Sequence, residues 1–380
     1  MGSHSPEPQK LWVETSCIPS LPLSRAAGCN IFLKLENLQP SGSFKSRGIG
    51  SMMYRAFLER CSSLGRAPAS SSSAHDEEPI VHFYCSSGGN AGLACATAAA
   101  TLGQPCTIVV PTLVTPFMTD KLRALGAEVV QIGENWAVAD AHLRENLLSR
   151  DAERGVYVPP FDHPHVWHGA SGMVDEIIAQ VSSLGGGGVG GGSQRDDAHQ
   201  VDAIVCSCGG GGLLNGIMEG VKRHAKASSQ TTENGGPVTP PRVLAVETVG
   251  AESLDASIKA GRLVTLPAIT SIATSLGAPT VSARTFQWAR EAPHLSNLVV
   301  SDADAVMGSV RFADDARILV EVACGAAICP AYNGDLRRCL GQGLSDEEWS
   351  RKNVVLVVCG GSNVSLDILR GYREKYNVHA

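Results

Sequence analysis

Short apolar runs that end at glycine- or proline-containing junctions, and then continue into helix-like segments, recur along this chain. The run PIVHFYC (79–85) leads through SSGGNAG into the alanine-rich LACATAAATLG, which ends at Gly103. The next run, CTIVVP, is followed by Thr115 and Pro116, which are typical of a helix start, and then by the run EVVQIG. This alternation predicts an α/β fold in which open, mostly parallel twisted sheets are flanked by helices.

Similar runs return beyond residue 155 as VYVPPF, VDAIVCSC, RVLAVE and NVVLVVC, and they predict a second, larger sheet. A chain of 380 residues is longer than one core usually supports, so we expect two lobes. We place a small domain at residues 43–158. The large domain is then formed by residues 1–42 together with residues 159–380.

The overall composition excludes several classes of partner. There are 31 basic and 37 acidic residues, a net charge of −6, and no basic block interleaved with aromatic residues, so we expect no nucleic acid. No apolar run approaches the ~20 residues of a membrane helix, and the start MGSHSPEPQK lacks the apolar core of a secretory signal. The 12 cysteines are irregularly spaced, which indicates reduced thiols in a cytoplasmic protein with no membrane partner.

Two runs of four glycines stand in different contexts. The first lies in segment 182–200, which, like segment 61–79, is rich in Gly, Ser and charge; we expect both segments to be flexible insertions without a chemical role. The second, at 209–212, directly follows a strand-like run and precedes LLNGIMEGVKRH. Its backbone N–H groups can converge on an anion at a helix N-terminus, so it predicts a phosphate site. Close packing of strand and helix is the alternative for any one of these glycines.

Lys45 lies in the turn SGSFKSRG (41–48), next to Phe44. A lysine whose pKa is lowered by burial can form a Schiff base with an aldehyde, although an ordinary surface lysine is the simpler interpretation of this stretch alone. The glycine run fails the dinucleotide pattern G-x-G-x-x-G, because Leu214 or Asn215 stands at the last position, so a dehydrogenase is disfavoured. A reactive lysine and a phosphate site together indicate pyridoxal phosphate.

The chain carries SGSFKSRG, CSSGGNAG, CSCGGGGLLNG, VETVGAES, ILVEVACGAA and VVCGGSNVS, in this order. From about residue 11 to residue 375 it therefore resembles the fold type II, tryptophan synthase β-like, pyridoxal 5'-phosphate enzymes, and among them the catabolic L-serine/L-threonine dehydratases. The resemblance implies an amino acid as the small-molecule substrate and a homodimer.

The same resemblance implies which residues contact the cofactor. Lys45 forms the Schiff base, and Phe44 packs against one face of the pyridine ring. Cys359 faces the pyridine nitrogen, and because a thiol is a weak donor the ring stays largely neutral, which favours elimination over transamination. The residues that resemble the phosphate loop are Gly209, Gly210, Gly211, Gly212 and Leu213.

Two further sets of residues are implied by the resemblance. The loop that binds the substrate carboxylate corresponds to Ser86, Ser87, Gly88, Gly89 and Asn90, and Asn90 also bonds the phenolic oxygen of the cofactor. The positions that supply oxygens to a monovalent cation, which we expect to be K+, correspond to Glu247, Ala251, Ser253 and Ser275. For Glu247 alone, a carboxylate at a strand end in a salt bridge is an equal alternative.

The expected reaction is β-elimination, which converts L-serine to pyruvate and ammonia and L-threonine to 2-oxobutyrate, with Lys45 removing the α-proton. A serine racemase and a β-replacement enzyme of the cysteine synthase type are the alternatives within the same chemistry. Cys359 disfavours replacement, since such relatives usually carry serine there. A non-catalytic relative that only binds pyridoxal phosphate is disfavoured, because the sequence retains all four of the expected site residues Lys45, Ser87, Asn90 and Cys359.

Overall fold

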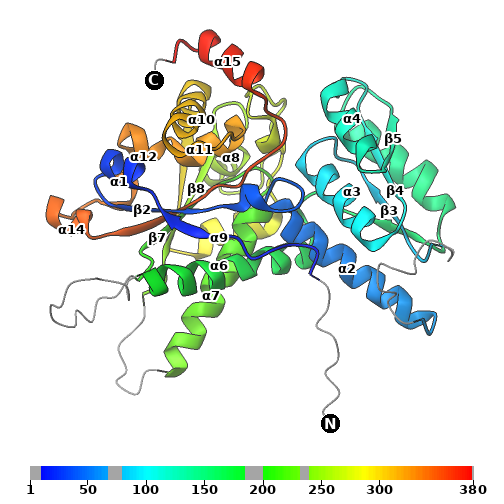
Figure 1. Cartoon of the computed structure of the whole chain (residues 1–380), viewed down its shortest axis with the longest axis horizontal. Helices are drawn as coiled ribbons and strands as arrows, with labels where there is room; N and C mark the ends of the chain where they lie inside the picture. Colours follow the sequence, from blue (N-terminus) through cyan, green and yellow to red (C-terminus); the bar gives the residue numbers. More distant parts are fainter. Residues whose placement is uncertain (1–9, 67–78, 185–199, 232–238, 379–380) are drawn as a thin grey trace. The chain divides into compact units, whose positions relative to one another are not determined.

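The computed structural model describes residues 10–66, 79–184, 200–231 and 239–378 (Figure 1). The described residues divide into two compact units. The smaller unit holds residues 45–160 with the short segments before residue 14 and at 39–41, and the larger unit holds the rest.

The smaller unit is built on a four-stranded sheet in the order β5-β4-β3-β6, in which every neighbouring pair is parallel. Its strands are β3 (His82–Cys85), β4 (Cys106–Val110), β5 (Glu128–Gln131) and β6 (Gly155–Tyr157). The run VYVPPF thus supplies a strand to this sheet, beside β3, and its assignment to the larger sheet was wrong. The physical reason is pairing: Tyr84 and Tyr157 are neighbours in register, a long-range contact that periodicity does not reveal.

Helices cover both faces of this smaller sheet. A large apolar cluster forms where α2, α3 and α4 pack on one face, and a small cluster of Tyr84, Val109, Ala139 and Leu143 forms on the other. The predicted helix ends are confirmed at Gly103, which has φ +64°, and at Pro116. The helical segments are α2 (Lys45–Ser63), α3 (Asn90–Leu102), α4 (Pro116–Ala124), α5 (Trp136–His142), the π-helical η2 (Leu143–Leu147) and the 3-10 helix η3 (Leu148–Arg150).

The larger unit contains a six-stranded sheet in the order β1-β2-β10-β7-β8-β9, parallel except for the β1–β2 pair. Its strands are β1 (Cys17–Pro19), β2 (Asn30–Lys34), β7 (Ala203–Ser207), β8 (Arg242–Thr248), β9 (Leu295–Val300) and β10 (Asn353–Val357). Residues of β7 and β10 are all buried, which explains why these runs are almost continuously apolar.

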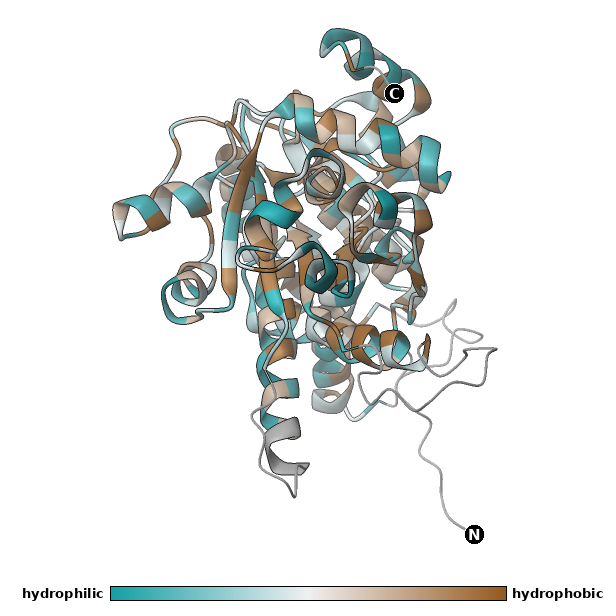
Figure 2. Cartoon of the chain, turned by 90° about the vertical axis from the view of Figure 1, so that its left-hand side faces the viewer, coloured by the Kyte–Doolittle hydropathy of each residue, from teal (hydrophilic) through white to brown (hydrophobic). Residues whose placement is uncertain are grey.

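Helices pack around this larger sheet, and the hydrophilic α15 appears mostly teal in Figure 2. None of the helices within the described ranges is long and apolar enough to cross a bilayer. The helical segments are α1 (Leu21–Ala27), η1 (Glu36–Leu38), α6 (Pro164–Leu184), α7 (Gly212–Thr231), α8 (Ser253–Ala260), η4 (Thr274–Leu276), α9 (Ala283–Glu291), α10 (Asp302–Ala316), α11 (Val322–Ile328), α12 (Pro330–Asn333), α13 (Asp335–Leu340), α14 (Asp346–Ser350) and α15 (Leu366–Lys375).

The N-terminal segment groups with the smaller unit, whereas the sequence placed it in the large domain. Leu11 is buried in the core of the smaller unit, and Gln39 bonds both the N–H and the C=O of Val13. These contacts hold residues 10–13 to the smaller unit although they precede a strand of the larger sheet.

The two expected insertions fall largely outside the described residues. Of segment 61–79, residues 67–78 are not described, and of segment 182–200, residues 185–199 are not, so the first glycine run is among the residues not described. The described starts of both segments are helical, because α2 and α6 continue into them.

Candidate active site

Lys45 is the first residue of α2, and it follows a short segment that bonds to the end of β10. The N–H of Phe44 donates to the carbonyl oxygen of Cys359 at 3.1 Å, and Ser43 forms a bridge with Gly360. The Lys45 ammonium group donates to the carbonyl oxygen of Pro160, and the residue is half-buried. The lysine is thus held at a helix start, directly after a segment fixed beside Cys359.

The loop Ser86–Asn90 lies between the carboxyl end of β3 and the start of α3. The first N–H groups of a helix have no partner within the helix, so this loop offers donors to an anion. Gly92, which we did not predict, is needed here because a Cβ at this position would lie 1.9 Å from the carbonyl oxygen of Ser87. The signal was present in the sequence as the last glycine of SSGGNAG.

Ser86 differs from its neighbours in the loop because it is completely buried. Its hydroxyl donates to the carboxylate of Asp140, which also accepts from the hydroxyl of Tyr157. Sequence reasoning missed both partners, since no motif links residues so far apart in the chain. Ser87, in contrast, is only half-buried, and its hydroxyl accepts from the N–H of Gly89 at 3.4 Å.

The second glycine run lies between β7 and α7, as the sequence predicted. Gly211 has φ +94°, and a Cβ there would lie 1.7 Å from the Thr285 hydroxyl oxygen. A Cβ at Gly210 would lie 2.4 Å from the ring of Phe161. At Gly209 and Gly212 the nearest contact to such a Cβ is 3.0 Å, so all four positions favour glycine on packing grounds. Close packing does not exclude an anion site here. The same glycine backbone leads into α7, a helix of 20 residues, and the N–H groups at the start of that helix can bind an anion.

Cys359 follows β10 and is buried. Its Sγ lies 3.3 Å from the hydroxyl oxygen of Ser207, at the end of the adjacent β7. Burial, and then a hydrogen bond with Cys359, raise the pKa of Cys324 well above its ordinary value. An uncharged hydroxyl and a protonated thiol therefore lie beside the Cys359 thiol.

Glu247 lies near the end of β8 and is completely buried. Its carboxylate accepts from the N–H groups of Leu254 and Asp255, at 2.8 and 2.9 Å, and from the side-chain amide of Asn297 at 3.0 Å. Burial raises the pKa of Glu247 to about 7, against these three hydrogen bonds, which lower it. Within the described ranges Glu247 forms no ion pair, so the structure gives no support to the salt-bridge alternative.

Ala251 and Ser253 lie at the start of α8, directly before the two residues whose N–H groups donate to Glu247. The hydroxyl of Ser253 is buried and has no hydrogen-bond partner among the described residues. Ser275 is turned elsewhere: its hydroxyl donates to the carboxylate of Glu321. A search of the described residues finds no group of three or more His, Cys, Asp or Glu side chains suited to a metal ion.

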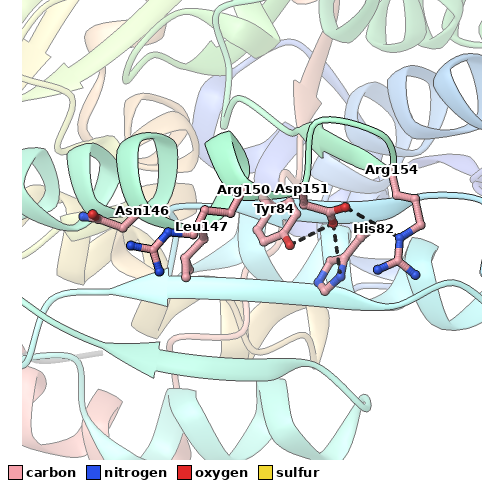
Figure 3. A pocket seen from close by; sticks show the side chains of 7 residues that line it. All are labelled: His82, Tyr84, Asn146, Leu147, Arg150, Asp151 and Arg154. Carbon is pink, nitrogen blue, oxygen red and sulfur yellow. Dashed lines mark hydrogen bonds and ion pairs between the residues drawn. The ribbon is translucent and has the colours of Figure 1, made fainter.

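A pocket in the smaller unit contains none of the predicted site residues (Figure 3). In Figure 3 the Asp151 carboxylate points toward the hydroxyl of Tyr84, the ring of His82 and the guanidinium of Arg154. The residues that line the pocket are His82, Tyr84, Asn146, Leu147, Arg150, Asp151 and Arg154.

Comparison with known proteins places these features in one family. A family model described as pyridoxal-phosphate dependent enzyme matches residues 9–360. The chain is 40% identical over 360 residues to the L-serine dehydratase/L-threonine deaminase of Bos taurus, covering 94% of this chain and 93% of the relative. It is 37% identical over 341 residues to the catabolic L-serine/threonine dehydratase of Saccharomyces cerevisiae, covering 89% of this chain and 84% of the relative.

The fold is also similar to solved structures. A fungal L-serine ammonia-lyase from Rhizomucor miehei matches with a TM-score of 0.77 and 34% identity, over 97% of this chain and 100% of the other. A maize serine racemase matches with a TM-score of 0.70 at 22% identity, over 96% of this chain and 93% of the other, and so supports the fold alone. The α/β architecture with two parallel-sheet regions is that of the fold type II enzymes, and the chain belongs to the family of pyridoxal-phosphate-dependent enzymes.

Proposed function

We propose that this protein is an L-serine ammonia-lyase that releases pyruvate and ammonia from L-serine and 2-oxobutyrate from L-threonine. The printed names of the relatives at 37–40% identity support this choice of substrate and reaction. The observation that carries the proposal is the hydrogen bond from Phe44 to Cys359, since it holds the segment before Lys45 beside the thiol predicted to face the cofactor ring.

The residues present fit pyridoxal phosphate. The amine of Lys45 would hold the aldehyde, the N–H groups at the start of α7 would hold the phosphate, and the Cys359 thiol would face the pyridine nitrogen. When bound, the cofactor supplies a ring that withdraws electrons from the substrate Cα. Because the Ser207 hydroxyl and the Cys324 thiol beside Cys359 are uncharged, the ring nitrogen is not expected to gain a proton from these groups.

The chain's own groups would then perform the binding and proton transfer. Ser87 and the first N–H groups of α3 bind the substrate carboxylate, so that the Cα–H bond is oriented toward Lys45. The Lys45 amine takes the α-proton, a role that typically contributes ~10²- to 10⁴-fold to the rate. The β-hydroxyl then takes up a proton and leaves as water, and hydrolysis of the released enamine by water gives the oxo acid and ammonia.

The carboxylate of Glu247 and the oxygens of Ala251 and Ser253 are proposed to bind K+. The buried, unpartnered hydroxyl of Ser253 supports this assignment, because a buried oxygen without a partner is costly unless a ligand satisfies it. Ser275 would contribute only through its backbone carbonyl, since its hydroxyl bonds Glu321. The test is to replace K+ by tetramethylammonium: wild-type activity should fall, and the Glu247→Gln variant should not respond. Equal wild-type activity in both salts would refute the cation site.

The main experiment is a pyruvate-coupled assay with L-serine, combined with a visible spectrum of the purified protein. Wild type should be yellow and release pyruvate, whereas Lys45→Ala should be inactive and lack the visible band. Lys10→Ala, which removes an exposed lysine of the same unit, is the matched control and should behave as wild type. Accumulation of D-serine would support a racemase instead, and a thioether formed only with added thiol would support β-replacement.

The assembly and the location of the protein are part of the same proposal. The family resemblance supports a homodimer in the cytoplasm. Light scattering coupled to gel filtration measures the mass in solution, and a value close to a single 39.7 kDa chain would contradict the dimer.

A further inference from the structure

Asp140 is a buried carboxylate that accepts hydrogen bonds from three different elements of the smaller unit. The hydroxyl of Ser86 donates to Oδ1 at 2.5 Å, and the hydroxyl of Tyr157 donates to the same oxygen at 2.7 Å. The guanidinium of Arg144 donates to Oδ2 at 2.7 Å. The Asp140 side chain is only 12% exposed, so these bonds are sheltered from water and are worth more than surface bonds.

The local backbone brings these groups together. Asp140 lies in α5 and Arg144 lies in the π-helical turn η2 that follows it. Single π-helical turns are rare and often occur at functional sites. Arg144 also covers the ring of Tyr157, with its guanidinium carbon 3.9 Å from the ring centroid. The positive charge compensates the buried carboxylate, which would otherwise be strongly unfavourable.

The hydroxyls of Tyr157 and Ser86 are both hydrogen-bond donors to Asp140. Burial, followed by the bond to Asp140, raises the pKa of Tyr157 to about 12, so its hydroxyl remains a donor at neutral pH. The Ser86 hydroxyl likewise acts as a donor, because its hydrogen bond goes to the carboxylate oxygen of Asp140. Ser86 is fully buried, and its hydroxyl is engaged by Asp140, so any contact of Ser86 with the substrate would have to come from its backbone. This differs from the role in substrate binding that the family resemblance implied for Ser86.

We propose that Asp140 is a positioning residue for the substrate carboxylate. By fixing the side chain of Ser86, it holds the first residue of the loop Ser86–Asn90, and with it the donors of Ser87 and the start of α3. Tyr157 and Arg144 hold Asp140 in place. The inference rests on the proposed function, because it takes this loop as the carboxylate site.

The test is Asp140→Asn, which keeps the size of the side chain and removes its charge. Losing a buried bond to a charged group typically weakens the interaction roughly tenfold or more. We therefore expect the KM for L-serine to rise about tenfold with kcat nearly unchanged, since binding to the carboxylate is common to ground and transition states. The affinity for L-alanine, which has a carboxylate but no leaving group, should fall by the same factor in a titration followed by the visible spectrum.

Glu145→Gln is the matched control, because it removes a charge from the adjacent turn at an exposed position. It should leave KM and the affinity for L-alanine unchanged. Tyr157→Phe, which removes one donor to Asp140 and keeps the ring under Arg144, should raise KM in the same direction but by less. This second variant keeps the test decisive if Asp140→Asn does not fold.

The result that would overturn the proposal is a lower melting temperature in the Asp140 and Tyr157 variants with unchanged KM and unchanged affinity for L-alanine. Asp140 would then stabilise the fold without positioning the loop. Failure of the proposed function looks different: wild type would release no pyruvate from L-serine. The titration with L-alanine would still measure whether Asp140 controls carboxylate binding.

Discussion

The close approach of α6 and α7 makes Gly220→Ala a sensitive test of how the phosphate loop is held. A Cβ at Gly220 would lie 2.6 Å from Cγ2 of Val174 and 2.7 Å from the carbonyl oxygen of Ser171, both on α6. Ordinary contacts between carbon atoms are about 3.5–4.0 Å, so the two helices must separate by about 1 Å. Because α7 begins at the glycine loop, this shift should also move the N–H groups predicted to bind phosphate.

The expected change in stability can be worked from these distances. Overpacking of this kind lowers the free energy of unfolding by about 1–3 kcal/mol, and the higher helix propensity of alanine raises it by about 1 kcal/mol. We expect a net loss of up to about 2 kcal/mol, which lowers the melting temperature by a few degrees at most. Gly172→Ala on α6 is the matched control: no heavy atom lies within 4 Å of its Cβ position, so it should raise stability by about 0.5–1 kcal/mol.

Thermal unfolding of both variants, together with titration of the cofactor-free proteins with pyridoxal phosphate, measures the two effects. Gly220→Ala should melt lower than wild type and bind the cofactor more weakly, while Gly172→Ala should melt slightly higher and bind it normally. The reasoning is refuted if Gly220→Ala is as stable as Gly172→Ala and binds the cofactor like wild type.

Burial, opposed by nearby Asp151, lowers the pKa of His82, so below pH ~6.5 the unfolded state binds more protons and stability falls as the pH drops. The free energy of unfolding, measured with urea, should therefore fall less between pH 7 and pH 5 in His82→Gln than in wild type. An equal fall in both proteins would contradict the role of His82 in this pH dependence. Cys359→Ser should keep most of the elimination activity, because a hydroxyl is also a neutral partner for the ring nitrogen, whereas Cys359→Asp should lower it and increase transamination. Equal ratios of pyruvate to transamination product in the two variants would contradict the role of Cys359.

Much of the fold could be predicted because strand and helix signals are local. Gly103 and Pro116 mark helix ends through their own backbone geometry, and the structure has both ends where the sequence placed them. The run VYVPPF was assigned to the wrong sheet because its partner, β3, lies more than 60 residues earlier in the chain. Leu11 packs in the smaller unit for a similar reason, since nothing in its local sequence specifies that contact.

The candidate site was predictable where a single stretch carries the chemistry. Lys45, the loop after β3 and the second glycine run all lie at junctions that the sequence displays. Asp140 and Tyr157 were not predictable, because hydrogen bonds between distant segments leave no spacing to read. The tight packing of Gly210 against Phe161 was equally hidden, since it depends on how the chain folds back onto the loop.

The most direct test of the proposed chemistry is reduction of the purified protein with borohydride, followed by mass spectrometry of its peptides. The account predicts a stable pyridoxyl adduct on Lys45 and loss of pyruvate release from L-serine. An adduct on a different lysine, or an active enzyme with no adduct on Lys45, would contradict it.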